Sequence, residues 1–130
     1  MKKSGLLHAE LSRIVARAGH TDTVVLADVG LPVPPGVPCI DLAVSAGIPS
    51  LESVLRATLS ELVLERATVA LELKTRSPLL HARIFPLLGP VVDEVSHEQF
   101  KTLCLSALVV VRTGEATPYG NVMLHCGVNF

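Results

Sequence analysis

The sequence predicts an α/β fold in which helices cover a mostly parallel sheet. Short, solidly apolar segments alternate with amphipathic ones along the chain, as in sheets whose strands are joined by helices. The longest uninterrupted apolar run, 107–111, is far shorter than the roughly 20 residues that a membrane helix needs. A chain of 130 residues with no internal repeat and no linker predicts one domain over 1–130.

The first half of the chain predicts two helices and two strands around a rigid loop. In order, these are a helix over 7–18, a strand over 23–27, a loop over 31–38, a strand over 39–42 and a helix over 50–57. The first helix has an apolar stripe and is followed by Gly19. The loop contains four prolines, which lack the N–H that helices and strands use. Ser50 and Glu52 are typical of an N-cap and a first helical turn.

The second half predicts the remaining helices and strands. In order, these are a strand within 62–73, a helix over 77–88, a strand over 91–95, a helix over 96–103, a strand over 107–112, a turn-rich loop over 113–120 and a strand over 121–126. The segment 62–73 is also compatible with a helix. Pro78 is typical of a helix start, and Gly89 with Pro90 of a helix end. Ser96 and Gln99 form a capping-box pattern, in which each side chain bonds the other's backbone N–H.

The composition indicates partners of the same kind rather than a nucleic acid. Hydrophobic residues make up 49% of the chain and charged residues only 18%, which leaves more apolar surface than a small monomer normally exposes. We therefore expect contacts with other subunits. A net charge of −1 and 3% aromatic residues disfavour a nucleic-acid surface, which needs clustered Lys/Arg and stacking rings.

Targeting and cysteine patterns indicate a cytoplasmic protein. The chain begins Met-Lys-Lys, but His8, Glu10 and Arg13 interrupt any apolar export segment. Three cysteines, odd in number and without CxxC spacing, fit reduced thiols.

Common cofactor motifs do not occur in the sequence. We find no GxGxxG, no GxxxxGK[ST], no HExxH and no paired Cys or His at zinc spacing. No Ser or Cys lies in a recognisable nucleophile elbow. The chemistry offered by the chain is therefore that of histidine, carboxylate and amide groups.

His20 and Asp28 flank the strand predicted over 23–27 and are read as one candidate site. Ligands bind at the carboxyl ends of strands in α/β sheets. His20 follows a helix end and neighbours Asp22, which suits proton transfer near neutral pH. A purely capping role for His20 is equally compatible with the sequence. For Asp28, bonding to the backbone N–H groups of the next turn is the favoured alternative.

Three further candidates lie later in the chain. His97 occupies the first turn of a helix, and Tyr119 and Asn121 surround Gly120 where a loop meets a strand. Glycine allows close backbone approach, and the two side chains can bond a sugar hydroxyl. Their alternatives are an exposed histidine and an ordinary turn. The other histidines are read as surface, interface or packed residues: His8, His81 and His125.

Several motifs in the same order resemble the D-ribose pyranase branch (RbsD) of the RbsD/FucU family. The resemblance covers almost the whole chain. Its motifs are GHTDT at 19–23, Asp28 with GLPVP at 30–34, IDLA at 40–43, GIPS at 47–50, HEQFK at 97–101, RTGE at 112–115, PYGN at 118–121 and CGVNF at 126–130. The LPVP and HEQFK segments favour the ribose branch over the fucose mutarotase branch.

The resemblance implies a three-layer αβα sandwich and an isomerase that interconverts the pyranose and furanose forms of D-ribose in D-ribose catabolism. It implies general acid/base ring opening and reclosure without a cofactor or metal. The catalytic residue falls on His20, and the substrate-binding residues fall on Asp28, His97, Tyr119, Gly120 and Asn121. It also implies a homodecamer of two pentameric rings with sites at subunit boundaries. The alternatives are a fucose-type sugar mutarotase and a non-catalytic sugar-binding ring protein.

Overall fold

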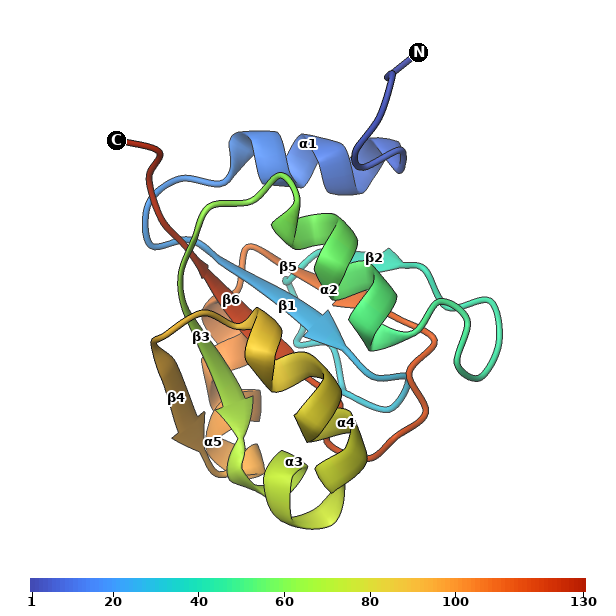
Figure 1. Cartoon of the computed structure of the whole chain (residues 1–130), viewed down its shortest axis with the longest axis vertical. Coiled ribbons are helices and arrows are strands. Elements are labelled where there is room, and N and C mark those ends of the chain that lie inside the picture. Colours follow the sequence, from blue (N-terminus) through green and yellow to red (C-terminus); the bar gives the residue numbers. More distant parts are fainter.

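A single six-stranded sheet runs through the computed structural model, which describes all 130 residues (Figure 1). Its strands are β1 (Thr23–Ala27), β2 (Cys39–Asp41), β3 (Leu64–Ala70), β4 (Val92–Val95), β5 (Val109–Arg112) and β6 (Val122–Cys126). They lie in the order β2-β5-β1-β6-β3-β4. Every neighbouring pair is parallel except the two that include β6. The sheet is therefore mostly parallel, as predicted, with one reversed strand near its centre.

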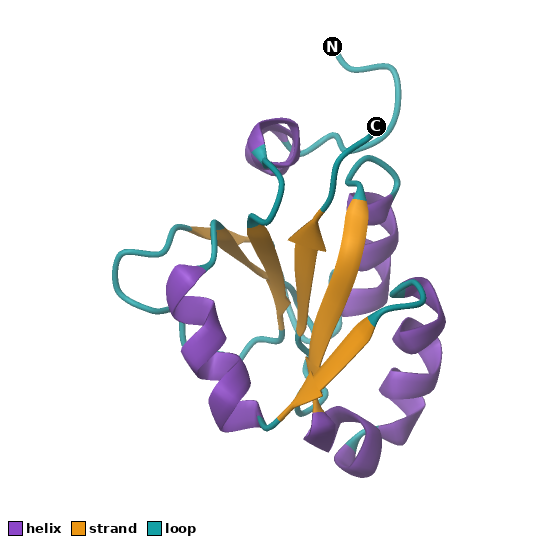
Figure 2. Ribbon diagram, turned by 90° about the vertical axis from the view of Figure 1, so that its left-hand side faces the viewer, coloured by secondary structure: helices purple, strands orange, loops and turns teal.

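Helices cover both faces of the sheet (Figure 2). They are α1 (Ala9–Arg17), α2 (Leu51–Leu59), α3 (Leu71–Arg76), α4 (Pro78–Ile84) and α5 (His97–Leu103), with short 3-10 turns at Phe85–Leu87 and Cys104–Ser106. The helices α1 to α4 contribute to one hydrophobic cluster, and α5 contributes to the other. The expected three-layer αβα sandwich is confirmed.

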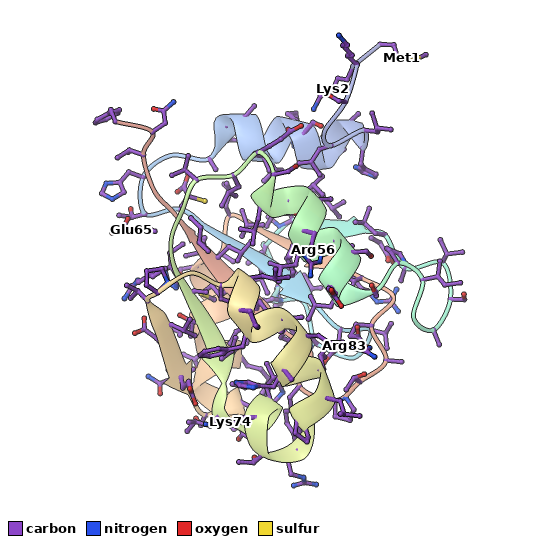
Figure 3. The ribbon with its side chains drawn as sticks, in the orientation of Figure 1. Met1, Lys2, Arg56, Glu65, Lys74 and Arg83 are labelled. Atoms are coloured by element: carbon purple, nitrogen blue, oxygen red, sulfur yellow. The ribbon has the colours of Figure 1, made fainter.

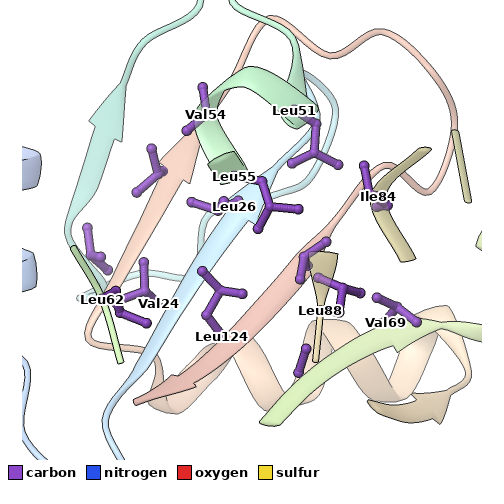
Figure 4. Packing of buried hydrophobic residues seen from close by; sticks show 14 of the residues in the cluster. Val24, Leu26, Leu51, Val54, Leu55, Leu62, Val69, Ile84, Leu88 and Leu124 are labelled. Atoms are coloured by element: carbon purple, nitrogen blue, oxygen red, sulfur yellow. The ribbon is translucent and has the colours of Figure 1, made fainter. Parts of the chain in front are cut away.

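The alternation of β1 divides the core between the two faces. Val24 and Leu26 pack into a cluster of 20 buried residues, whereas Val25 and Ala27 pack into a cluster of 8. Successive strand side chains point to opposite faces, so a strand covered on both sides must be apolar throughout. The larger cluster, drawn in Figure 4, carries most of the apolar burial.

The N-caps of two helices follow the sequence signals. The Ser50 hydroxyl accepts a hydrogen bond from the Ser53 N–H (3.1 Å), and the Ser96 hydroxyl accepts one from the Gln99 N–H (3.1 Å). Only this half of the predicted capping box forms. The Gln99 side chain makes no hydrogen bond to the Ser96 N–H.

Several boundaries differ from the sequence predictions. The helix expected over 77–88 ends at Ile84 and is followed by a 3-10 turn, and the strand expected over 107–112 begins at Val109. The strand expected within 62–73 ends at Ala70. Residues 71–73 belong to α3, so the helical alternative holds for the end of that segment. The first helix begins at Ala9 rather than at residue 7, because the Nδ1 atom of His8 accepts the Leu11 N–H (3.2 Å) as an N-cap. No helix is long and apolar enough to span a bilayer. All three cysteines are free.

We expect Leu55→Ala to lower the free energy of unfolding by about 2–5 kcal/mol. Leu55 in α2 is fully buried in the larger cluster, so truncation leaves a cavity. Urea denaturation at a fixed subunit concentration measures the change. Leu79→Ala is the matched control, because Leu79 is 81% exposed and its truncation should shift stability by less than about 0.5 kcal/mol. Equal losses for the two variants would contradict this core.

Candidate active site

Residues from distant parts of the chain meet at the carboxyl edge of the sheet. Asp28 follows β1, and His97 follows β4. Because β6 is antiparallel to β1, Asn121 at its start lies at the same edge. The reversed strand therefore adds the Tyr119–Asn121 loop to the edge where ligands bind in α/β sheets.

Asp28 and Asn121 form a buried, reciprocal pair. The Asn121 amide donates to the Asp28 carboxylate (2.9 Å), and the Asp28 N–H donates to the Asn121 side-chain carbonyl (2.9 Å). The other Asp28 oxygen accepts N–H groups from Gly30 (2.9 Å) and Leu31 (2.8 Å). The turn-bonding interpretation of Asp28 is thus correct, but it does not exclude a site. Asp28 also lines a pocket of about 160 Å³ with Glu115.

The loop before Asn121 needs glycine at position 120. A Cβ atom there would lie 2.9 Å from the Glu115 Cγ atom and 3.0 Å from a Leu80 methyl group. Tyr119 adopts a positive φ of 62°, and its carbonyl accepts the Asn121 N–H (2.8 Å). The loop is therefore held close to its neighbours, and its two polar side chains have fixed positions.

His97 joins this group through its ring. The His97 and Tyr119 rings meet edge to face with centroids 5.1 Å apart. The His97 Nδ1 atom is buried and has no hydrogen-bond partner within the chain. The five residues expected to bind substrate thus form one connected row: Asp28, Asn121, Gly120, Tyr119 and His97.

His20 lies at the opposite edge of the sheet. Its Nε2 atom is 2.8 Å from a carboxylate oxygen of Glu65, and both side chains are about half exposed. Asp22, expected to be the neighbouring carboxylate, instead accepts the Gly19 N–H (2.9 Å). His20 borders an open pocket of about 290 Å³ formed with Val63 and the C-terminal segment 126–130.

His20 and Asp28 do not meet within a single chain. They stand at the two ends of β1, and a strand of its five residues spans roughly 17 Å. Figure 3 labels one residue at each edge: Glu65 near the start of β3, on the His20 side, and Lys74 in α3, which follows β3 at the carboxyl edge. The candidate residues of one chain therefore form two separate candidate half-sites, one at each edge of the sheet.

The remaining histidines have structural surroundings. His125 bonds Thr68 through Nε2 (2.8 Å), and burial, followed by the charge of Arg66, lowers the pKa of His125. His125 is accordingly packed, as expected. Next to it, burial raises the pKa of the Cys126 thiol to about 11, so no thiolate stands beside His20 at neutral pH. His81 packs its ring on Phe85.

Sequence reasoning missed three carboxylates at these edges. Glu65 pairs with His20, and Glu72 accepts the His97 N–H. Glu115, 8% exposed, accepts the Leu51 N–H (3.1 Å) and ties its loop to the start of α2. Only Glu115 lay within a recognised motif; the other two contacts join residues far apart in sequence, and no local pattern signals them. No group of three or more His, Cys, Asp or Glu side chains is arranged to hold a metal ion.

Comparisons with known proteins place the chain in a family. The model of the RbsD / FucU transport protein family matches residues 1–129. The chain is 48% identical to a D-ribose pyranase of Exiguobacterium sibiricum over 130 residues and 47% identical to one of Laribacter hongkongensis over 131 residues, covering 100% of each protein.

Solved structures agree with the sequence matches. The structure of Bacillus subtilis RbsD complexed with D-ribose superposes with a TM-score of 0.96 at 40% identity, covering 100% of both chains. A fucose mutarotase from Streptococcus pneumoniae in complex with L-fucose reaches a TM-score of 0.76 at 21% identity over 95% of both chains, which shows a shared fold. The chain belongs to the RbsD / FucU transport protein family.

Proposed function

We propose that this chain is a D-ribose pyranase, an isomerase that interconverts the pyranose and furanose forms of D-ribose. The observation that carries the proposal is the 48% identity to a D-ribose pyranase over the full length of both chains. The likeness to an RbsD solved with D-ribose supports it. The unbroken polar row at the carboxyl edge adds hydrogen-bonding groups that suit sugar hydroxyls.

His20 acts as the general acid and base in the proposed mechanism. In ring opening, His20 gives a proton to the ring oxygen while water accepts the proton of the anomeric hydroxyl. After rotation about a C–C bond, a different hydroxyl attacks the aldehyde and gives its proton to His20, while water returns a proton to the former carbonyl oxygen. Glu65 is placed to accept a hydrogen bond from the Nε2–H group of His20. The Nδ1 atom of His20 is then left to exchange protons with the sugar.

The residues of the carboxyl edge hold the hydroxyls that do not react. Asp28 and Asn121 are fixed by their mutual bonds, so they offer acceptors and donors without reorganising. His97 and Tyr119 close the other end of the row, and Gly120 lets their loop lie directly against Glu115 and Leu80. This chemistry needs no metal or cofactor, because ring opening is already accessible without a catalyst.

A complete site takes His20 from one chain and Asp28 from a second. Two different surfaces then meet at each contact, and such head-to-tail contacts close into rings. Exposed apolar residues near the half-sites suit this contact, including Val29 beside Asp28 and Val63 beside His20. We propose that two such pentameric rings form a decamer, in line with the family resemblance.

We also propose a cytoplasmic location, which suits the three free thiols.

We expect His20→Ala to slow the exchange between the ribose ring forms by about 10²–10⁴-fold, because the proton-transfer group is lost. Saturation-transfer NMR on D-ribose with and without protein measures this rate. His8→Asn is the matched control, since asparagine keeps the N-cap acceptor of α1 and His8 lies outside both half-sites. Wild-type acceleration in His20→Ala would refute the role of His20.

The same measurement on a panel of sugars separates the proposal from its alternatives. A pyranase accelerates pyranose–furanose exchange of D-ribose. Faster anomer exchange of L-fucose, without an effect on ribose, would identify a mutarotase instead. Ribose binding without any acceleration would identify a non-catalytic sugar-binding ring.

The shared site predicts complementation between two inactive variants. We expect His20→Ala and Asp28→Asn each to be nearly inactive alone, whereas coexpressed rings containing both recover about a quarter of the wild-type sites. Each chain carries a different affinity tag, and double-tagged rings are purified before the NMR assay. Activity no greater than that of the single variants would show that both residues serve one chain's own site.

A further inference from the structure

We propose that Glu72 is a positioning residue for His97 and so for sugar binding at the carboxyl edge. This inference rests on the proposed function in one respect, the contact between His97 and the sugar. Its structural part, that Glu72 holds the backbone and ring of His97, stands on contacts within the chain and is tested separately.

The contact joins two neighbouring loops at the carboxyl edge. One Glu72 oxygen accepts the His97 N–H at 3.0 Å and the other lies 3.3 Å from the same nitrogen. Glu72 is the second residue of α3, directly after β3, and His97 is the first residue of α5, directly after β4. Because β3 and β4 are parallel neighbours, their carboxyl ends lie side by side.

The N–H of His97 needs such a distant acceptor. The first N–H groups of a helix have no partner within the helix. Ser96 caps α5 through the N–H of Gln99, which leaves the His97 N–H without a local acceptor. A carboxylate there forms a charge-assisted bond and also suits the positive end of the helix.

The Glu72 carboxylate has no other role in the fold. It forms no ion pair, and the His97 N–H is the only group that donates a hydrogen bond to it. The nearest basic residues in the sequence, Lys74 and Arg76, are exposed and unpaired. Because the Glu72 carboxylate bonds only the backbone N–H of His97, we infer that its role is to position His97.

The ring of His97 depends on this backbone position. It meets Tyr119 edge to face, and its Nδ1 atom is buried without a hydrogen-bond partner, so the contact with Tyr119 depends on where the first turn of α5 holds the ring. Release of the N–H would let that turn shift and would move the ring away from Tyr119. We infer weaker sugar binding with proton transfer at His20 left intact.

The test compares Glu72→Ala, Glu72→Gln and the control Glu94→Ala, which removes an exposed glutamate from β4. We expect Glu72→Ala to raise the ribose concentration for half-maximal exchange about tenfold. This is the lower end of the loss in affinity that follows removal of a residue that orients a ligand-contacting residue. The rate at saturating ribose should change less than about twofold, because binding alone is weakened. Glu72→Gln keeps an acceptor oxygen and should recover most of the affinity.

Two readouts separate this proposal from the proposed function. Hydrogen exchange of the His97 amide and the ¹⁵N shifts of its ring are measured without sugar, and both should change in Glu72→Ala but not in Glu94→Ala. In a His97→Ala background, Glu72→Ala should add little to the loss of affinity.

Unchanged His97 signals in Glu72→Ala, or additive losses with His97→Ala, would overturn the positioning role. An equal loss of the saturated rate in Glu72→Ala and Glu72→Gln would also overturn it, since that pattern indicates general damage. A wild-type protein that fails to accelerate ribose exchange would refute the proposed function, while the His97 signals would still decide the role of Glu72.

Discussion

The length and rigidity of β1 are the constraint on which the function of this chain depends. Val24 to Ala27 are almost fully buried, and the strand is paired on both sides in the sheet, so packing and ladder hydrogen bonds hold it in place. His20 and Asp28 are therefore held at opposite edges in every copy. A chain built in this way can use both residues on one sugar only by meeting a second chain, and its low charge content is consistent with such contacts.

The carboxyl edge is organised by polar side chains that cross from one loop to another. Asp28, Glu115 and Glu72 each accept backbone N–H groups, and the latter two do so at the starts of α2 and α5. A buried N–H without a partner is costly, so these contacts fix the loops as well as satisfy them. The same edge that is held by these bonds presents the residues proposed to bind the sugar. Stability and preorganisation of the site therefore have the same source.

Local patterns predicted the parts of this fold that depend on local chemistry. The strand over 23–27 has the predicted bounds because an apolar run of that length can only be buried, and Ser50 and Ser96 mark their helices through hydroxyl caps. The segment 62–73 is compatible with a strand or a helix because its residues suit either state until tertiary contacts decide, and the structure changes from β3 to α3 between Ala70 and Leu71. Strand direction has no local signal, so the arrival of Asn121 beside Asp28 through the reversed β6 could not be predicted from spacing. The partner of His20 was misassigned for the same reason, since Glu65 lies on another strand.

Sequence likeness and geometry answer different parts of the functional question. Identity to D-ribose pyranases bears on which sugar is used, but it does not explain why His20 stands apart from the residues at the other edge. The proposed head-to-tail contact would account for this separation, because it would set the proposed acid/base group of one chain against the proposed binding row of another. The proposed site would then depend on assembly, since a dissociated chain would hold His20 apart from the row that runs from Asp28 to His97. Under this proposal, activity should follow the population of rings rather than that of folded chains.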